Sequence, residues 1–135
     1  MNDHTEYVDG RAEPAFIDAV HDAMERLWAA VPGIGDEDRE MFALAVSEIV
    51  TNVVEHASGR ESISVTAQVS ATARDLCAVL TDDAHPALID LEAVSMPGVD
   101  AESGRGLALA LASLDELIHE PGAGNRWRLL RHRRD

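Results

Sequence analysis

Lysine is absent from this sequence: all 11 basic residues among its 135 are arginine. The absence excludes mechanisms that need a lysine amine, including the P-loop, Schiff-base chemistry and the strand lysine of ordinary protein kinases. Positive charge is scarce altogether, because 25 acidic residues give the chain a formal net charge of −14. Nucleic-acid binding draws most of its affinity from basic groups on phosphates, so the composition argues against direct binding of nucleic acid.

Cysteine and long apolar runs are also scarce. The single cysteine, Cys77, cannot form an internal disulfide, and its strand-like surroundings favour buried packing over catalysis. The apolar runs are too short to span a bilayer, and no basic-then-apolar leader opens the chain, so we expect no membrane association and a cytoplasmic location. Hydrophobic residues make up 46% without a shift in composition, which predicts one domain over residues 1–135.

The stretch from Asp36 to Ala57 predicts an amphipathic helix that Gly59 ends. Its apolar residues recur at helical spacing: Phe42, Val46, Ile49, Val50 and Val53. Glu48 and Asn52 interrupt this run and lie one turn apart on the same side. A carboxylate can act as a base and an amide oxygen can bind a hard cation such as Mg²⁺. From these residues alone, a partly solvated polar stripe explains the pattern equally well.

The segments around this helix predict a sheet covered by helices on one side. Residues 14–31 form a first helix, with Met24 and Trp28 assigned to the core. Residues 62–69 and 76–81 alternate between apolar and polar side chains and form a hairpin. Alternation of this kind favours an antiparallel sheet with one solvated face. Residues 125–131 alternate again and form a last strand, and the arginines that follow are interpreted as a solvated strand edge and tail: Arg131, Arg133 and Arg134.

The late part of the chain carries a second weak signal. Residues 90–103 lack a period and predict a mobile loop. Gly104-Arg105-Gly106 then opens a helix whose predicted apolar face is Leu107, Leu111, Leu114 and Ile118. A glycine pair at a helix start leaves backbone amides free to hold an anion, although a plain loop explains the pair better when it is taken alone.

Three signals occur in a fixed order: the helix with Glu48 and Asn52, Asp82 at a strand end, and the glycine pair of residues 104–106. This order resembles the ATP-binding domain shared by gyrase, histidine kinases and mismatch-repair ATPases, the GHKL superfamily. Within it, the chain is most similar to the small stand-alone serine kinases that act as bacterial anti-sigma factors. The resemblance extends from Pro14 to Arg131 and includes the turn and strand of residues 122–127. It implies an α/β two-layer sandwich with helices on one face of a mixed, mostly antiparallel sheet.

The resemblance also implies roles for individual residues. Asn52 would ligate the Mg²⁺ that bridges the ATP phosphates, and Glu48 would orient or deprotonate the attacking hydroxyl. Asp82 would receive the adenine amino group. The phosphate-binding turn, beneath an ATP lid of about residues 90–103, would comprise Gly104, Arg105, Gly106 and Leu107.

The activity implied is that of a Mg²⁺/ATP-dependent protein-serine kinase that works by partner switching, in a homodimer. It would bind a sigma factor in one state and phosphorylate a serine on an anti-sigma factor antagonist in another. Ala84 departs from the family, which usually has glycine there, and this favours an alternative: a non-enzymatic regulatory module with a degenerate nucleotide pocket. Pro86 is a second departure. A catalytic fragment of a histidine kinase is a further alternative, disfavoured because little chain precedes the first helix.

Overall fold

The computed structural model describes residues 3–57, 63–84 and 102–134, without the side chains of 56, 57 and 102–105. The elements follow one another as β1 (His4–Arg11), α1 (Pro14–Ala30), α2 (Asp36–Ala57), β2 (Ser64–Ala71), β3 (Asp75–Asp82), α3 (Glu102–Ser113), β4 (Glu116–Pro121) and β5 (Asn125–His132). None of the helices in these ranges is both long enough and apolar enough to cross a membrane.

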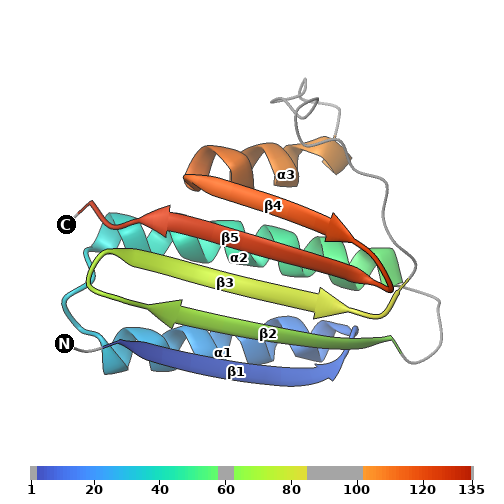
Figure 1. Ribbon diagram of the computed structural model, residues 1–135, viewed down its shortest axis with the longest axis horizontal. Helices are drawn as coiled ribbons and strands as arrows, with labels where there is room; N and C mark the ends of the chain where they lie inside the picture. The colour runs from blue at the N-terminus through green and yellow to red at the C-terminus, as the bar shows by residue number, and fades with distance from the viewer. Residues whose placement is uncertain (1–2, 58–62, 85–101, 135) are drawn as a thin grey trace.

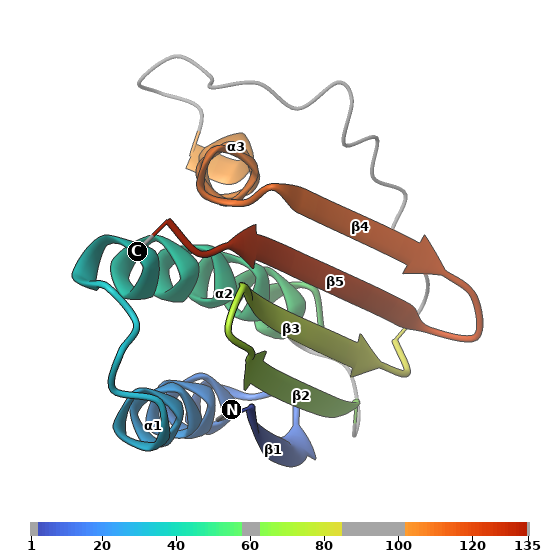
Figure 2. The same ribbon diagram turned by 60° about the vertical axis from the view of Figure 1, so that its left-hand side comes forward.

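The five strands form one sheet in the order β1-β2-β3-β5-β4. Each of the four pairings between neighbouring described strands is antiparallel. The helices lie on one face of this sheet, and α3 lies beside α2 near the β4 edge (Figures 1 and 2). The predicted two-layer sandwich is therefore confirmed, and its described strand pairs are antiparallel throughout.

The core lies between the sheet and the helices. Alternate residues of β2 and β3 are buried, and so are the residues of the predicted apolar face of α2. The apolar residues that recur every two positions in the strands and every 3.6 positions in the helix therefore pack in the same core. Met24 and Trp28 belong to this core, as predicted. Burying one large apolar side chain contributes about 1.5–3 kcal/mol, and many contribute here, including Leu27, Phe42, Ile49, Leu76, Leu80 and Leu129.

The strand β4 corrects the prediction for the late part of the chain. The predicted helix extended to Ile118, but α3 ends at Ser113 and Ile118 pairs with Arg128 of β5. The physical reason lies in Asp115: its backbone N–H donates to the Leu130 carbonyl at 2.8 Å, which starts the pairing of β4 with β5. The helix also begins at Glu102 rather than Gly104, so the predicted loop of residues 90–103 gives its last two residues to α3.

Cys77 also differs from its prediction. It is half-buried rather than buried, because the residues of β3 that face the helices are its neighbours Leu76 and Ala78. Cys77 pairs with Ser70 and Leu130 on the face of the sheet opposite the helices.

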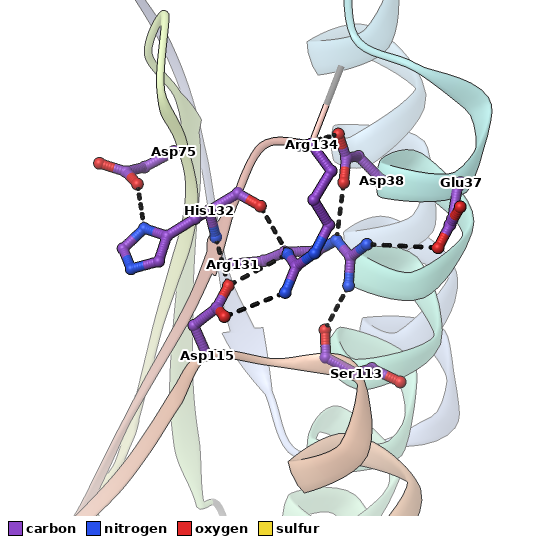
Figure 3. A network of polar contacts seen from close by, with 8 residues as sticks. All are labelled: Glu37, Asp38, Asp75, Ser113, Asp115, Arg131, His132 and Arg134. Carbon is purple, nitrogen blue, oxygen red and sulfur yellow. Dashed lines mark hydrogen bonds and ion pairs between the residues drawn. The ribbon is translucent and has the colours of Figure 1, made fainter.

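The C-terminal arginines are not simply a solvated tail. Arg131 is in phase with the buried residues of β5, and its side chain is 4% exposed. Its Nε donates to Asp38 Oδ1 at 2.9 Å, and the Asp38 side chain is 2% exposed. A second guanidinium nitrogen donates to the Ser113 carbonyl at 2.9 Å. Arg131 therefore joins the first turn of α2, β5 and the end of α3 (Figure 3).

A second ion pair continues this network towards the C-terminus. Arg134 donates to both carboxylate oxygens of Asp115, at 3.1 and 3.0 Å, and the His132 backbone N–H donates to Asp115 at 2.6 Å. The hydrogen bond from His132, followed by that from Arg134, lowers the pKa of Asp115. His132, the last residue of β5, is hydrogen-bonded to Asp75 of β3, and this bond raises the pKa of His132.

Candidate functional site

The predicted site residues come from elements that meet at one end of the molecule. Figure 1 shows the C-terminal ends of α2 and β3, the start of β5 and the start of α3 at this end. Glu48 and Asn52 lie in the C-terminal half of α2, Asp82 ends β3, and residues 104–107 lie near the start of α3. Segments far apart in the sequence therefore meet at this end of the molecule.

Glu48 lies directly against the glycine-containing turn of α3. A Cβ placed on Gly106 would lie 2.5 Å from Glu48 Oε2, well inside van der Waals contact, so only a glycine fits without moving the carboxylate. The Glu48 side chain is half-buried, which leaves part of it accessible from outside. The first and last of the three sequence signals are therefore in contact.

Asn52 lies one turn further along α2, and its side chain is also half-buried. Its carboxamide oxygen is a suitable hard ligand for Mg²⁺, and one such protein ligand is enough because Mg²⁺ keeps several waters and substrate phosphates. The described residues contain no cluster of three or more histidine, cysteine or acidic side chains that could hold a metal by themselves. The donor set thus fits a cation that arrives with a polyphosphate.

The predicted phosphate-binding turn is described in part. Gly104 and Arg105 belong to the first turns of α3, and Leu107 packs against the core. The Arg105 side chain lies outside the described atoms. Pro86 and the lid residues 90–101 lie outside the described residues altogether.

Asp82 ends β3 with its carboxylate held by two donors. The Ala84 backbone N–H donates to Oδ1 at 2.9 Å, and the Asn125 side-chain nitrogen donates to the same oxygen at 3.0 Å. Among the described residues, none donates a hydrogen bond to Oδ2. Ala84 itself is 3% exposed, so its methyl group is packed inside the protein. Asp82 therefore presents one carboxylate oxygen that can accept from a ligand.

The start of β5 approaches Asp82 very closely. A Cβ on Gly124 would lie 1.9 Å from the Asp82 carbonyl oxygen, so the backbones can meet this way only because residue 124 is glycine. Asn125, which follows, is 4% exposed and its Oδ1 accepts a hydrogen bond from His119 at 2.8 Å. Gly124 and Asn125 lie in the stretch that carried the family resemblance, yet neither was predicted as a site residue. His119 carried no local signal.

Residues 10–130 match the sequence family described as the histidine kinase-like ATPase domain. The chain belongs to this family. Its description implies ATP as the ligand, in agreement with the expectation from the motifs. No curated protein sequence matches this chain.

Solved structures of two relatives of this histidine kinase-like ATPase domain share its fold. The first contains the RsbU and RsbW domains of Rv1364c from Mycobacterium tuberculosis, with a TM-score of 0.65, 22% identity, and coverage of 96% of this chain and 32% of that one. The second is the histidine kinase domain of the blue-light activated histidine kinase EL346 from Erythrobacter litoralis. Its TM-score is 0.56 at 20% identity, over 86% of this chain and 58% of that one. This chain thus spans about a third of the length of the first protein and somewhat over half of the length of the second.

The histidine kinase-like ATPase domain also has a groove of about 480 Å³ between α1 and α2. Its lining is partly apolar, and His21 and Ser47 form a hydrogen bond across it at 2.7 Å. Glu25 and Glu40 line it as well and would repel the phosphates of a nucleotide. The predicted site residues Glu48, Asn52 and Asp82 are not among the residues that line this groove.

Proposed function

We propose that this chain is a Mg²⁺/ATP-dependent protein-serine kinase that acts as an anti-sigma regulatory factor by partner switching. It would bind a sigma factor in one state and phosphorylate a serine on an anti-sigma factor antagonist in the other. The observation that carries the proposal is the contact between Glu48 and Gly106, because it joins a base to the glycine-containing turn expected to bind phosphate. The structural likeness to a protein that contains an RsbW domain favours the regulatory form of the activity.

In this proposal, Glu48 accepts the proton of the serine hydroxyl while the hydroxyl oxygen bonds to the γ-phosphorus and ADP leaves. Asn52 would hold Mg²⁺, which neutralises charge on the phosphates when it is bound. Asp82 would accept from the adenine amino group. The free backbone amides of the first turn of α3, up to Gly104, would donate to phosphate oxygens, and Gly106 would let the helix lie close to Glu48. Arg105 and Leu107 complete this proposed ATP-binding segment.

The proposal is tested by calorimetric titration with ATP and Mg²⁺, followed by transfer of labelled phosphate to a protein that co-purifies from the native host. Glu48→Ala should keep ATP binding and lose about 10²–10⁴-fold in transfer rate, the range for a positioned base. Glu55→Ala, an exposed glutamate on the same helix, is the matched control and should transfer normally. Normal transfer by Glu48→Ala would show that the base is misassigned.

Asn52→Ala separates the cation site from the rest of the pocket. Its ATP affinity should fall in the presence of Mg²⁺ and change little in the presence of EDTA, because only the Mg²⁺-dependent part of binding is removed. Equal losses under the two conditions would contradict a role for Asn52 as a metal ligand.

A non-enzymatic regulatory module remains the second candidate, because Ala84 stands where the family usually has glycine. Its packed methyl group and its N–H bond to Asp82 allow the aspartate to keep its place, which favours the kinase. No ATP binding at millimolar nucleotide would decide for the module. Homodimer formation and a cytoplasmic location are parts of the proposal, which sedimentation and cell fractionation would test.

A further inference from the structure

We propose that His119 is a positioning residue that acts through Asn125 on the Asp82 carboxylate, and so sets how strongly the site prefers adenine to a 6-oxopurine. The inference rests on the proposed function, in which Asp82 contacts the base.

The carboxylate of Asp82 needs to be positioned. The terminal torsion of an aspartate is broad and roughly two-fold, so a carboxylate at a strand end has no fixed orientation of its own. Asn125 supplies one constraint, because its Nδ2 donates to Asp82 Oδ1 at 3.0 Å. The Ala84 N–H supplies another at the same oxygen, at 2.9 Å. With both donors on Oδ1, Oδ2 is the oxygen left to accept from a base.

The Asn125 amide in turn depends on His119. A carboxamide oxygen only accepts, so the contact of 2.8 Å between His119 Nε2 and Asn125 Oδ1 requires a proton on Nε2. An ionised Asp82 only accepts, so the amide presents its nitrogen to Asp82 and its oxygen to His119, whose Nε2–H holds it in that orientation. If Asn125 turned over, two acceptors would face each other at Asp82 and two donors at His119.

The sheet holds His119 in place for this contact. His119 pairs with Trp127 in the β4–β5 register, and Asn125 pairs with Asp82 in the β3–β5 register, two residues earlier on β5. The His119 and Trp127 rings are 4.4 Å apart, and Trp127 is 3% exposed. Asn125, at 4% exposed, is buried between His119 and Asp82. Three adjacent strands thus form one hydrogen-bonded row, His119–Asn125–Asp82.

This row distinguishes adenine from a 6-oxopurine because an ionised carboxylate accepts hydrogen bonds and does not donate them. The 6-amino group of adenine can donate to Oδ2, whereas the 6-oxo group of hypoxanthine places an acceptor there. A site that loses a hydrogen bond to the correct group also loses its discrimination. Disturbing His119 should therefore weaken ATP binding selectively and leave the weak binding of ITP almost unchanged.

The experiment compares ATP and ITP, which differ only at this edge of the purine, by calorimetry with Mg²⁺. His119→Leu should weaken ATP binding about tenfold and ITP binding less than about twofold, as expected for one hydrogen bond to a charged group. His119→Gln keeps a donor nitrogen at the position of Nε2 and should restore the ATP:ITP ratio. His21→Leu is the control, because His21 bonds Ser47 in the groove between α1 and α2.

An unchanged ratio of ATP to ITP affinity in His119→Leu, whether both affinities fall equally or neither falls, would overturn the inference. ATP binding by the wild type would still support the proposed function in that case. If the wild type bound neither nucleotide, the proposed function would fail and this inference with it. A measurement on the wild type covers the case in which His119→Leu does not fold. Long-range ¹H–¹⁵N NMR spectra should show the neutral His119 ring protonated on Nε2. A proton on Nδ1 instead would remove the donor that His119 Nε2 offers to Asn125 Oδ1 and would refute the row.

Discussion

Replacing Arg131 with methionine should destabilise this protein more than replacing any exposed arginine of the same strand. The substitution keeps most of the buried aliphatic stem and removes the guanidinium. Asp38 then keeps the Arg134 backbone N–H, at 2.8 Å, and loses its charged partner at 2.9 Å. The Ser113 carbonyl at the end of α3 loses its donor as well.

The expected loss is about 3–5 kcal/mol in the free energy of unfolding, the range for removing one partner of a buried ion pair. Both partners qualify, since their side chains are 4% and 2% exposed. Arg128→Met is the matched control: Arg128 and Glu116 are 3.6 Å apart, with side chains 44% and 43% exposed. An exposed pair of this kind contributes about 0–1 kcal/mol.

Urea unfolding measures the difference. With a slope of about 2 kcal/mol/M, the midpoint should fall by about 1.5–2.5 M for Arg131→Met and by less than about 0.5 M for Arg128→Met. The double variant Asp38→Leu/Arg131→Met should be more stable than Arg131→Met, because it removes the uncompensated buried carboxylate. Similar midpoints for Arg131→Met and Arg128→Met, or no recovery in the double variant, would refute the assignment of the loss to a buried charge.

Three further predictions concern the glycines and one surface histidine. Gly124→Ala should cost about 1–3 kcal/mol and weaken ATP binding, because its Cβ meets the Asp82 backbone, whereas Gly122→Ala, with no atom within 4 Å, should behave as wild type in urea unfolding and calorimetry. Gly106→Ala should retain most ATP affinity and slow phosphate transfer, because the methyl group displaces the flexible Glu48 carboxylate; unchanged transfer kinetics would contradict the contact. The pKa of His132 is raised by Asp75, so its stabilising effect is fully present below its ordinary pKa of 6.5 and is lost as the pH rises through the raised folded pKa. The difference in stability between wild type and His132→Ala should therefore be smaller at about pH 8.5 than at about pH 5.5, and a difference that grows with pH would exclude the ion pair.

The sequence predicted β2, β3 and β5, which each have one dry and one wet face, and missed β4, which does not. In β2 and β3, alternate residues such as Val65 and Leu80 are buried, and this alternation is visible in the letters. In β4 the first four residues are all half-buried, so no period of two exists to be found. Ile118 instead fell in helical phase with Leu107, and only the pairing with β5 decides against a helix.

Arg131 is a different case, because its signal was present and outweighed by residue type. It follows Trp127 and Leu129 at intervals of two, and the phase alone places it on the buried face. A charged residue near the end of a chain is usually solvated, and that tendency fails here because Asp38 lies opposite. The partner is 93 residues away in the sequence, so local patterns could not identify it.

The candidate site divides in the same way between local and long-range information. Glu48 and Asn52 were recognisable because two polar side chains interrupt the apolar face of one helix. The row His119–Asn125–Asp82 was not, because its members come from three strands and meet only through the sheet register. Residues proposed to contact the ligand could thus be found by motif, whereas the residues proposed to position them require the fold.

The two glycines at the site link these observations. A Cβ would come closest to its neighbours at Gly106 and Gly124 among the described glycines, and the neighbours are Glu48 and the backbone of Asp82. If these glycines served only to pack helices and strands, their contacts would be expected in the apolar core, as for Gly10 against Phe16. Instead each brings backbone against one of the two acidic residues that the nucleotide hypothesis requires. A module that binds no nucleotide would not need both of these close backbone contacts. Gly106→Ala and Gly124→Ala therefore test the nucleotide hypothesis by altering the backbone contacts of Glu48 and Asp82 rather than the acidic residues themselves.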